Sequence, residues 1–139
     1  MKRILFLLAF AGLSSIVSAQ TGEGVEFHKA PNLRKLGKLA AETEKLLFVD
    51  VFTTWCGPCQ FMDEKIFTQK EVGEFLNKQF LNAKYDADKD PWIATRYDVD
   101  SYPTFLILDS TGKEIGRLVG ASTNPRGFIK RVKQTANLE

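Results

Sequence analysis

The chain has 139 residues, which is enough for one domain with a hydrophobic core of its own. With 44% apolar and 26% charged residues, it is an ordinary globular sequence, and a disordered or low-complexity chain is excluded. The formal net charge is +2, but Lys2 and Arg3 contribute to it from a segment that we expect to be removed. No clustered basic stripe remains, so nucleic acid is not an expected partner.

Residues 1–19 are predicted to be a secretory signal peptide. A positively charged start precedes an apolar stretch over residues 4–13 and a small-residue cleavage site over residues 17–19. A membrane anchor is the alternative, but the apolar stretch is about half of the roughly 20 residues that a spanning helix needs. We therefore expect an exported protein whose mature chain begins near Gln20. It would be periplasmic in a Gram-negative bacterium and secreted otherwise.

The first predicted elements lie in and after a short lead. Residues 20–31 form this N-terminal lead, in which residues 25–28 are a candidate for a short edge strand, and residues 32–139 form the domain. Apolar residues at helical spacing predict an amphipathic helix that begins at Leu33, with Asn32 as its N-cap.

A central strand and a long helix are predicted next. Residues 46–52 are apolar at nearly every position, which indicates a strand covered on both faces, and only Asp50 interrupts the run. From Gln60 onward, apolar residues at helical spacing predict a long helix that is bent or interrupted around residues 68–70.

The second half of the chain completes an α/β pattern. We expect strands at residues 80–85, 105–108 and 114–119, a short helix around residues 92–97, and a last helix from about Asn124 with Pro125 in its first turn. The tight turn over residues 109–112 makes the last two strands antiparallel, whereas the earlier alternation of strand and helix favours parallel pairing. The expected fold is therefore a mixed central sheet with helices on both faces.

The only two cysteines, Cys56 and Cys59, lie between the central strand and the long helix. Structural zinc sites use four ligands, and the only histidine, His28, lies in the N-terminal lead, so we expect no metal site. A disulfide that closes so short a loop contributes little stability. Disulfide exchange is the chemistry that remains, with the Cys56–Cys59 disulfide in place of a separate cofactor.

The helix predicts different roles for the two thiols. If it opens at Cys56, unpaired backbone N–H groups and the positive end of the helix dipole favour the thiolate, which makes Cys56 the expected nucleophile. Cys59 falls on the same helix face, one turn deeper and less exposed, and is the expected resolving thiol. Pro58 lacks an N–H that would be unpaired in the first turn, so it stiffens the site at small cost.

The run Trp55-Cys56-Gly57-Pro58-Cys59 after a Val-Asp strand resembles the thioredoxin family, and the similarity extends from about Leu33 to the C-terminus. This resemblance implies a thioredoxin-like fold for residues 32–139. It also implies a thiol-disulfide oxidoreductase of the protein-disulfide reductase type, which reduces or isomerises protein disulfides through the dithiol.

The resemblance assigns further catalytic roles to Asp50 and Lys84. Asp50 matches a buried aspartate that accepts a proton from Cys59, and burial in an apolar strand is expected to raise its pKa. The alternative is a strand-end aspartate satisfied by backbone donors. Lys84 matches the lysine that pairs with this aspartate, and its alternative is a solvated lysine at a strand edge.

The resemblance also implies a surface that holds an extended substrate. Tyr102 and Pro103 match the cis-proline loop that faces the cysteines, and Gly120 matches a glycine of the same surface. Trp55 flanks this groove, although it could be a packing residue instead. The expected substrate-binding residues are Trp55, Gly57, Pro58, Tyr102, Pro103 and Gly120. Tyr102 and the residues at 53–54 depart from the common pattern of the family, which leaves the choice of substrate open.

A reductase needs a donor of electrons, and in bacteria a membrane thiol transporter is the expected one. We expect a monomer that acts on protein disulfides. The alternative is a binding module of the same fold or a Cu(I)-handling protein, because two thiolates are adequate ligands for that ion. Met62 could join such a site, but core or groove lining is the preferred interpretation.

Overall fold

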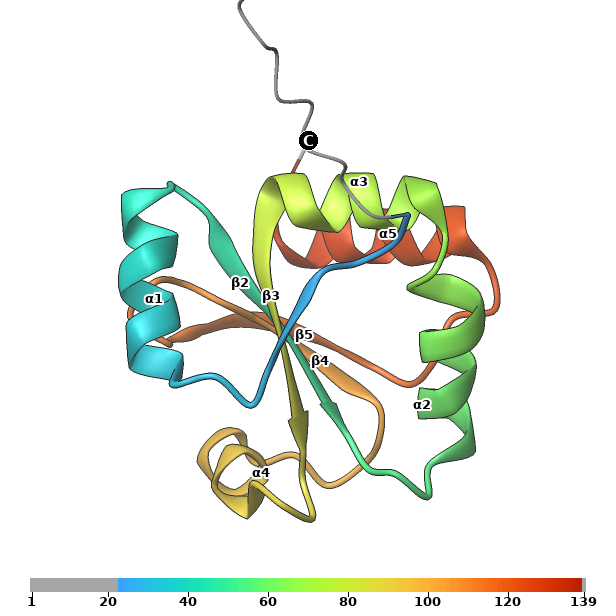
Figure 1. Ribbon diagram of the computed structural model, residues 1–139, viewed down its shortest axis with the longest axis horizontal. Helices are drawn as coiled ribbons and strands as arrows, with labels where there is room; N and C mark the ends of the chain where they lie inside the picture. The colour runs from blue at the N-terminus through green and yellow to red at the C-terminus, as the bar shows by residue number, and fades with distance from the viewer. Residues whose placement is uncertain (1–22, 139) are drawn as a thin grey trace, which may run out of the picture.

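The computed structural model describes residues 23–138, so the predicted signal peptide lies outside the described residues. Across the described part of the chain, no helix combines the length and the apolar character needed to span a bilayer. In chain order the elements are β1 (Phe27–Lys29), α1 (Leu33–Glu42), β2 (Leu46–Phe52), α2 (Gly57–Phe61), the π-helix η1 (Met62–Ile66), α3 (Lys70–Gln79), β3 (Phe80–Asp86), α4 (Pro91–Tyr97), β4 (Thr104–Leu108), β5 (Glu114–Val119) and α5 (Pro125–Thr135) (Figure 1).

A five-stranded sheet in the order β1-β3-β2-β4-β5 forms the centre of the fold. Strand β2 runs parallel to β3 and antiparallel to β4, and β5 runs antiparallel to β4. Because β2 has a strand on either side and helices on both faces, nearly all of its side chains are buried, as its continuous apolar sequence predicts. The predicted α/β class with a mixed sheet is confirmed.

The direction of β4 departs from the parallel pairing that the strand–helix alternation favoured. Helix α4 has seven residues and is about 10 Å long, less than half the length of β3. It is too short to return the chain to the other end of the sheet. The chain therefore re-enters the sheet from the end at which β3 left it, and β4 runs antiparallel to β2.

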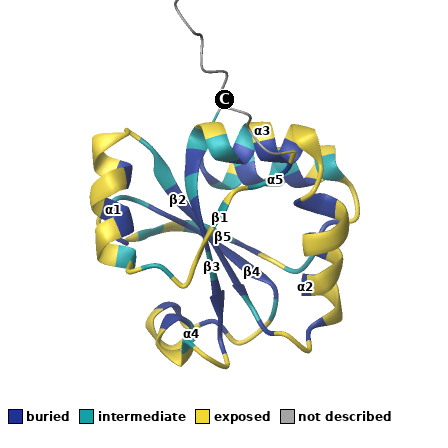
Figure 2. Cartoon of the chain, viewed as in Figure 1, coloured by how far each residue is buried: buried dark blue, intermediate teal, exposed yellow. Residues whose placement is uncertain are grey.

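Each face of the sheet carries its own hydrophobic cluster. Helices α1 and α4 cover one face, while η1, α3 and α5 cover the other. Figure 2 shows the buried residues on the sheet and on the inner sides of these helices. Along β2, Val49 and Val51 face the α1 and α4 side, whereas Phe48 faces α3 and α5. By the same alternation, Asp50 shares the face of Phe48.

The helix that follows the cysteines changes its geometry twice. Helix α2 runs directly into the π-helix η1, where the Phe67 N–H bonds to the Met62 carbonyl at 2.8 Å, and α3 starts separately at Lys70. The predicted interruption around residues 68–70 is thus confirmed. So is the Asn32 cap of α1, because its side chain accepts a hydrogen bond from the Lys35 N–H.

The described part of the lead packs onto the domain. Strand β1 pairs in parallel with β3 at the edge of the sheet, one to two residues later than predicted. Before it, the Val25 N–H bonds to the Phe67 carbonyl at 2.8 Å. Gly73 permits a close approach here, because a Cβ on it would lie 2.2 Å from the Gly24 carbonyl oxygen. Residues 24–29 are therefore an integral part of the fold.

Candidate active site

Cys56 and Cys59 form a disulfide at the start of α2, with their Cα atoms 5.3 Å apart. Cys56 is the N-cap of this helix, and its sulfur accepts a hydrogen bond from the Cys59 N–H at 3.2 Å. Hydrogen bonding and the helix dipole at this position would stabilise a Cys56 thiolate after reduction. The expected difference in depth is nearly absent, since the two residues are 5% and 4% exposed. Position at the helix start, and not exposure, distinguishes the two sulfurs.

Asp50 is buried in the middle of β2, with 2% of its surface exposed. Its Oδ2 lies 3.2 Å from the Lys84 ammonium, while its Oδ1 has no hydrogen-bond partner among the described residues. Burial raises the pKa of Asp50 from 3.8 to about 6, although the charge of Lys84 opposes this rise. A strand-end aspartate satisfied by backbone donors does not fit this environment. A carboxyl with such a pKa can exchange a proton near neutrality.

Lys84 lies directly opposite Asp50 in the parallel register of β2 and β3. Its side chain is only 11% exposed, and its ammonium lies 4.7 Å from the ring centroid of Phe52 and 5.1 Å from that of Phe27. The alternative of a solvated lysine at a strand edge is therefore wrong. Aromatic rings and carboxylates surround the Lys84 ammonium in place of the water that would solvate an exposed lysine.

Asp63 is a member of this cluster that the sequence interpretation missed. From η1 it forms an ion pair and a hydrogen bond with Lys84, while 43% of its own side chain stays exposed. Its negative charge raises the pKa of Asp50 further. An acidic residue on an exposed helix position looks like any solvated charge. The signal that could have identified it is its spacing, because Asp63 follows Cys59 by one helical turn.

Four of the six predicted substrate-binding residues lie in two contacting pairs. The Tyr102–Pro103 peptide bond is cis, and the Pro103 carbonyl accepts a hydrogen bond from the Gly120 N–H at 2.9 Å. Gly120 has a φ of +82°, a conformation that favours glycine, directly after β5. Tyr102 meets Trp55 edge to face, with ring centroids 6.1 Å apart.

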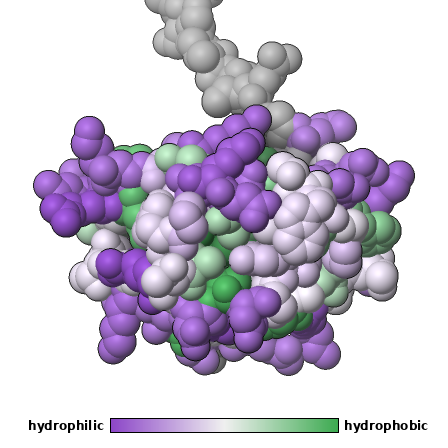
Figure 3. All heavy atoms as spheres, turned by 90° about the horizontal axis from the view of Figure 1, so that it is seen from below, coloured by the Kyte–Doolittle hydropathy of each residue, from purple (hydrophilic) through white to green (hydrophobic). Residues whose placement is uncertain are grey.

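Trp55 is 69% exposed, so the alternative of a simple packing residue does not fit. Its indole Nε1–H donates to the Asp88 carboxylate at 2.9 Å, which fixes the ring orientation. Asp88 is the second residue that the sequence interpretation missed, because the two positions are far apart in the chain. Gly57 and Pro58 are also exposed. Figure 3 shows hydrophobic side chains among hydrophilic ones when the molecule is seen from below the view of Figure 1.

Met62 is a core residue here, with 1% of its surface exposed. Its sulfur accepts a hydrogen bond from the Ser122 N–H at 3.3 Å, so it is already engaged inside the protein. His28 lies on the edge strand β1. Within residues 23–138, no three His, Cys, Asp or Glu side chains form a group that could hold a metal ion.

Comparison with known sequences identifies relatives over most of the described chain. The family model for thioredoxin matches residues 32–134. The chloroplastic thioredoxin Y1 of Arabidopsis thaliana is 36% identical over 101 residues, which cover 73% of this chain and 56% of that protein. A thioredoxin-like protein of Synechocystis is 40% identical over 83 residues, which cover 60% of this chain and 75% of that protein. The chain thus spans little more than half the length of the Arabidopsis relative.

Solved structures show the same fold. A candidate disulphide-isomerase from Bacteroides thetaiotaomicron superposes with a TM-score of 0.72 at 36% identity, covering 85% of this chain and 98% of that one. The DsbH oxidoreductase superposes with a TM-score of 0.73 over 86% of this chain and 89% of that one, but at 15% identity it shows the fold alone. With the family model matched from the first residues of α1 into α5, this chain belongs to the thioredoxin family.

Proposed function

We propose that this protein is an exported thiol-disulfide oxidoreductase that reduces or isomerises protein disulfides. One observation carries the proposal: the Cys56–Cys59 disulfide opens a helix in a fold that also holds a buried carboxyl, Asp50, with a pKa of about 6. The first feature supplies a nucleophilic thiol, and the second supplies a proton acceptor. Relatives named as thioredoxins and as a candidate disulphide-isomerase support the same chemistry.

The first step joins enzyme and substrate. The Cys56 thiolate attacks one sulfur of a substrate disulfide, forming a mixed disulfide while the other substrate sulfur leaves as a thiolate and takes a proton. The exposed Trp55 ring and the backbone around Pro103 would hold an extended substrate segment during this attack. Substrate contacts by Tyr102 and Gly120 belong to the same proposal.

The second step releases the product. Cys59 loses its proton toward Asp50 and attacks the Cys56 sulfur, which breaks the mixed disulfide and frees the second substrate sulfur as a thiolate that then takes up a proton. The substrate gains two electrons, and the enzyme is left with the Cys56–Cys59 disulfide. A donor must return two electrons for the next turnover, and no further cofactor is needed.

Export and the identity of the donor form the finer part of the proposal. The signal-peptide pattern of residues 1–19 supports export, so cytosolic reductants would not reach the protein. A membrane thiol transporter would then be the donor, acting on a monomeric enzyme. Mass spectrometry of the exported protein should give an N-terminus near Gln20. An intact Met1 on protein recovered from outside the cytoplasm would contradict cleavage.

Insulin reduction by dithiothreitol tests the enzymatic proposal. We expect the protein to accelerate this reaction and Cys56→Ser to abolish the acceleration, while circular dichroism shows that the variant is folded. Thr123→Ala, which alters an exposed residue outside the site, is the matched control and should keep full activity. Stoichiometric Cu(I) binding without insulin turnover would instead support the metal-handling alternative and overturn the proposal.

A trapping experiment identifies the substrates. Cys59→Ala removes the resolving thiol, so mixed disulfides on Cys56 should accumulate and can be identified by mass spectrometry. Cys56→Ala is the control, because it leaves only the resolving thiol. If Cys59→Ala captures no exported protein, reduction of protein disulfides is not its function.

A further inference from the structure

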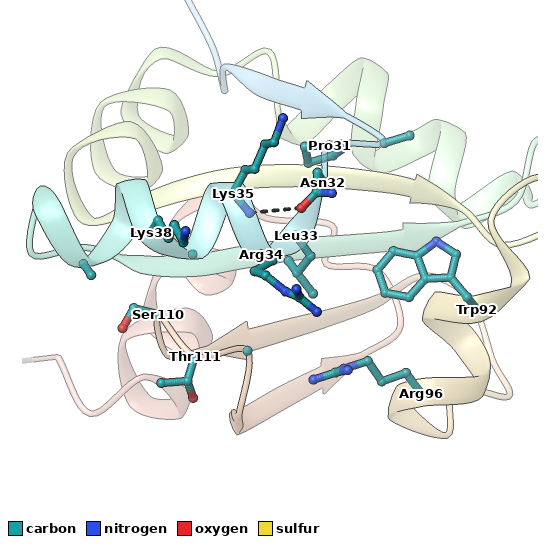
Figure 4. Close-up of a pocket in the computed structure, with 14 residues that line it drawn as sticks. Pro31, Asn32, Leu33, Arg34, Lys35, Lys38, Trp92, Arg96, Ser110 and Thr111 are labelled. Atoms are coloured by element: carbon teal, nitrogen blue, oxygen red, sulfur yellow. Dashed lines mark hydrogen bonds between the residues drawn. The ribbon is translucent and has the colours of Figure 1, made fainter.

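A groove of about 1140 Å³ lies between α1, α4 and the turn that joins β4 to β5, away from the disulfide (Figure 4). Gly37 lets α1 approach this turn, because a Cβ at that position would lie 2.3 Å from the Ser110 carbonyl oxygen. Two buried tyrosines brace the walls. The Tyr85 hydroxyl donates to the Pro31 carbonyl and the Tyr97 hydroxyl to the Gly112 carbonyl, each at 2.7 Å. The groove is therefore built into the fold.

Positive charge dominates the lining of this groove. Its charged residues are Arg34, Lys35, Lys38 and Arg96, and no carboxylate is among the lining residues. Within the described chain, none of these four cations forms an ion pair. Figure 4 shows Arg34 and Arg96 reaching from α1 and α4 into the same space beside the Trp92 ring. The absence of a basic stripe in the sequence was misleading here, because two distant helices supply the charges.

Helix stability does not account for the charges on α1. Arg34 and Lys35 occupy its first turn, which holds no acidic residue. The positive end of the helix dipole lies there, so cations at these positions oppose helix formation. The nearby Asp109 carboxylate accepts hydrogen bonds from Thr111 and Lys113 in its own turn and does not line the groove. The cations are left available to an external anion.

We propose that this groove docks an acidic segment of a protein partner. Arg guanidinium groups match carboxylates in geometry and charge, and Arg34 and Arg96 would each take one. Trp92, which is 42% exposed, offers an apolar surface to a neighbouring side chain of the segment. An apolar contact beside charge complementarity favours a peptide over a simple inorganic anion.

The groove lies one loop away from the candidate active site. Trp92 is in α4, and the loop before α4 contains Asp88, which holds the Trp55 indole. A partner seated in the groove would therefore contact α4, whose preceding loop holds Trp55 of the candidate active site, and would leave the disulfide uncovered. Docking as such is independent of the proposed function, whereas its use to bring a disulfide-bearing or dithiol-bearing partner to Cys56 depends on that function.

Fluorescence anisotropy with a fluorescein-labelled, Glu-rich peptide that contains one phenylalanine tests the docking. At physiological ionic strength we expect Arg34→Glu with Arg96→Glu to weaken binding by about tenfold or more, because like charges then face each other. The matched control, Lys78→Glu with Lys130→Glu, changes the net charge equally on α3 and α5 and should weaken binding less than about twofold. If the Glu variant fails to fold, Arg34→Gln with Arg96→Gln takes its place, and circular dichroism checks that this variant is folded.

Three outcomes would overturn the proposal. Equal weakening in both Glu double variants would mean attraction by net charge alone. Equal binding of the same peptide with Gln in place of Glu would remove the role of the carboxylates. Tighter binding of a charge-matched single-stranded oligonucleotide, lost in the same Arg variants, would assign the groove to nucleic acid.

A kinetic measurement tests the link to the active site. For a disulfide peptide with a Glu-rich tail, the Arg34→Glu and Arg96→Glu variant should raise KM by about tenfold and leave kcat unchanged, whereas a neutral-tailed peptide should show no change. An unchanged KM for the Glu-tailed peptide would show that docking in the groove does not help to bring substrates to the active site. If the protein reduces neither peptide, the proposed function fails, while the anisotropy result still decides the docking.

Discussion

Phe48 and Asp50 share a strand and a face of the sheet, and both are buried, yet their surroundings are opposite. The Phe48 ring stacks on Phe105 at 5.5 Å between centroids, and further aromatic rings surround it. These further rings are Phe27, Phe67, Phe80 and Phe128. Asp50 instead meets the Lys84 ammonium and the charge of Asp63.

The difference separates stability from chemistry along one strand. Burial of the Phe48 ring stabilises the fold, whereas burial of the Asp50 charge opposes folding. A pKa raised from 3.8 to about 6 corresponds to a cost of about 3 kcal/mol at neutral pH. The sheet therefore holds a destabilising group next to its buried aromatic cluster. The variants below test this division of roles.

Phe48→Ala should have the largest effect on stability. Removing a fully buried ring leaves a cavity between the sheet and α5, and we expect a loss of about 4 kcal/mol in the free energy of unfolding. Urea denaturation measures this loss. The rate of insulin reduction per folded molecule should stay within about twofold of the wild type, because the reacting groups are untouched. A large loss of specific activity in folded Phe48→Ala would mean that packing around Phe48 and chemistry at Asp50 are not separable.

Lys84→Met should have the next largest effect on stability. It leaves Asp50 buried without its cation, which costs about 3 kcal/mol near neutral pH. The pKa of Asp50 should rise, because Lys84 is the charge that lowers it. Denaturation at pH 7 and at pH 4 checks both effects, since most of the loss should vanish at pH 4, where Asp50 is protonated. An equal loss at both values would point to lost side-chain packing instead.

Asp50→Asn should act in the opposite direction on stability. The folded protein holds the Asp50 proton more tightly than the unfolded chain, so the charge contributes no penalty below pH 3.8 and a growing penalty as the pH rises through about 6. We expect the variant to be more stable than the wild type by up to about 3 kcal/mol at pH 7 and equally stable near pH 3.5. Urea titrations across this range measure the difference.

The same variant should resolve mixed disulfides slowly. Without the carboxylate, Cys59 loses its proton acceptor, and turnover at pH 7 should fall by about tenfold or more. Full activity together with raised stability would show that Asp50 is not the acceptor. Reduced activity without the pH-dependent stability gain would contradict the raised pKa.

Asp63→Asn should have the smallest effect. Its side chain is partly exposed, so we expect a stability change below about 1 kcal/mol. The pKa of Asp50 should nevertheless fall, because a repelling carboxylate is removed and Lys84 is left to Asp50 alone. Above a certain pH, the stability of the wild type falls below that of Asp50→Asn. When both proteins also carry Asp63→Asn, this pH should therefore be lower. Glu64→Gln, on an exposed position of the same helix, is the control.

Local patterns were sufficient to predict much of this molecule. The apolar run around Asp50, the Asn32 cap and the cysteine pair before a helix are all short-range features, and each is present as predicted. They depend on the periodicity and chemistry of neighbouring residues. The sequence therefore predicts the central strand and the helix start that carry the chemistry.

Features formed by residues far apart in the chain could not be predicted from the sequence. Asp63 and Asp50 both pair with Lys84, which lies on another strand, and the Asp88 carboxylate accepts a hydrogen bond from Trp55. The direction of β4 depends on how far α4 carries the chain, and the basic groove depends on two helices that line the same space. Periodicity contains no information on these distances.

The most direct test is a ¹³C NMR titration of the Asp50 carboxyl in the oxidised protein, repeated in Asp63→Asn. We predict a midpoint near pH 6 in the wild type, because burial disfavours the charged carboxylate, and a lower midpoint in the variant. A wild-type midpoint near the ordinary value of 3.8 would contradict the claim that this strand keeps a buried proton acceptor for the dithiol.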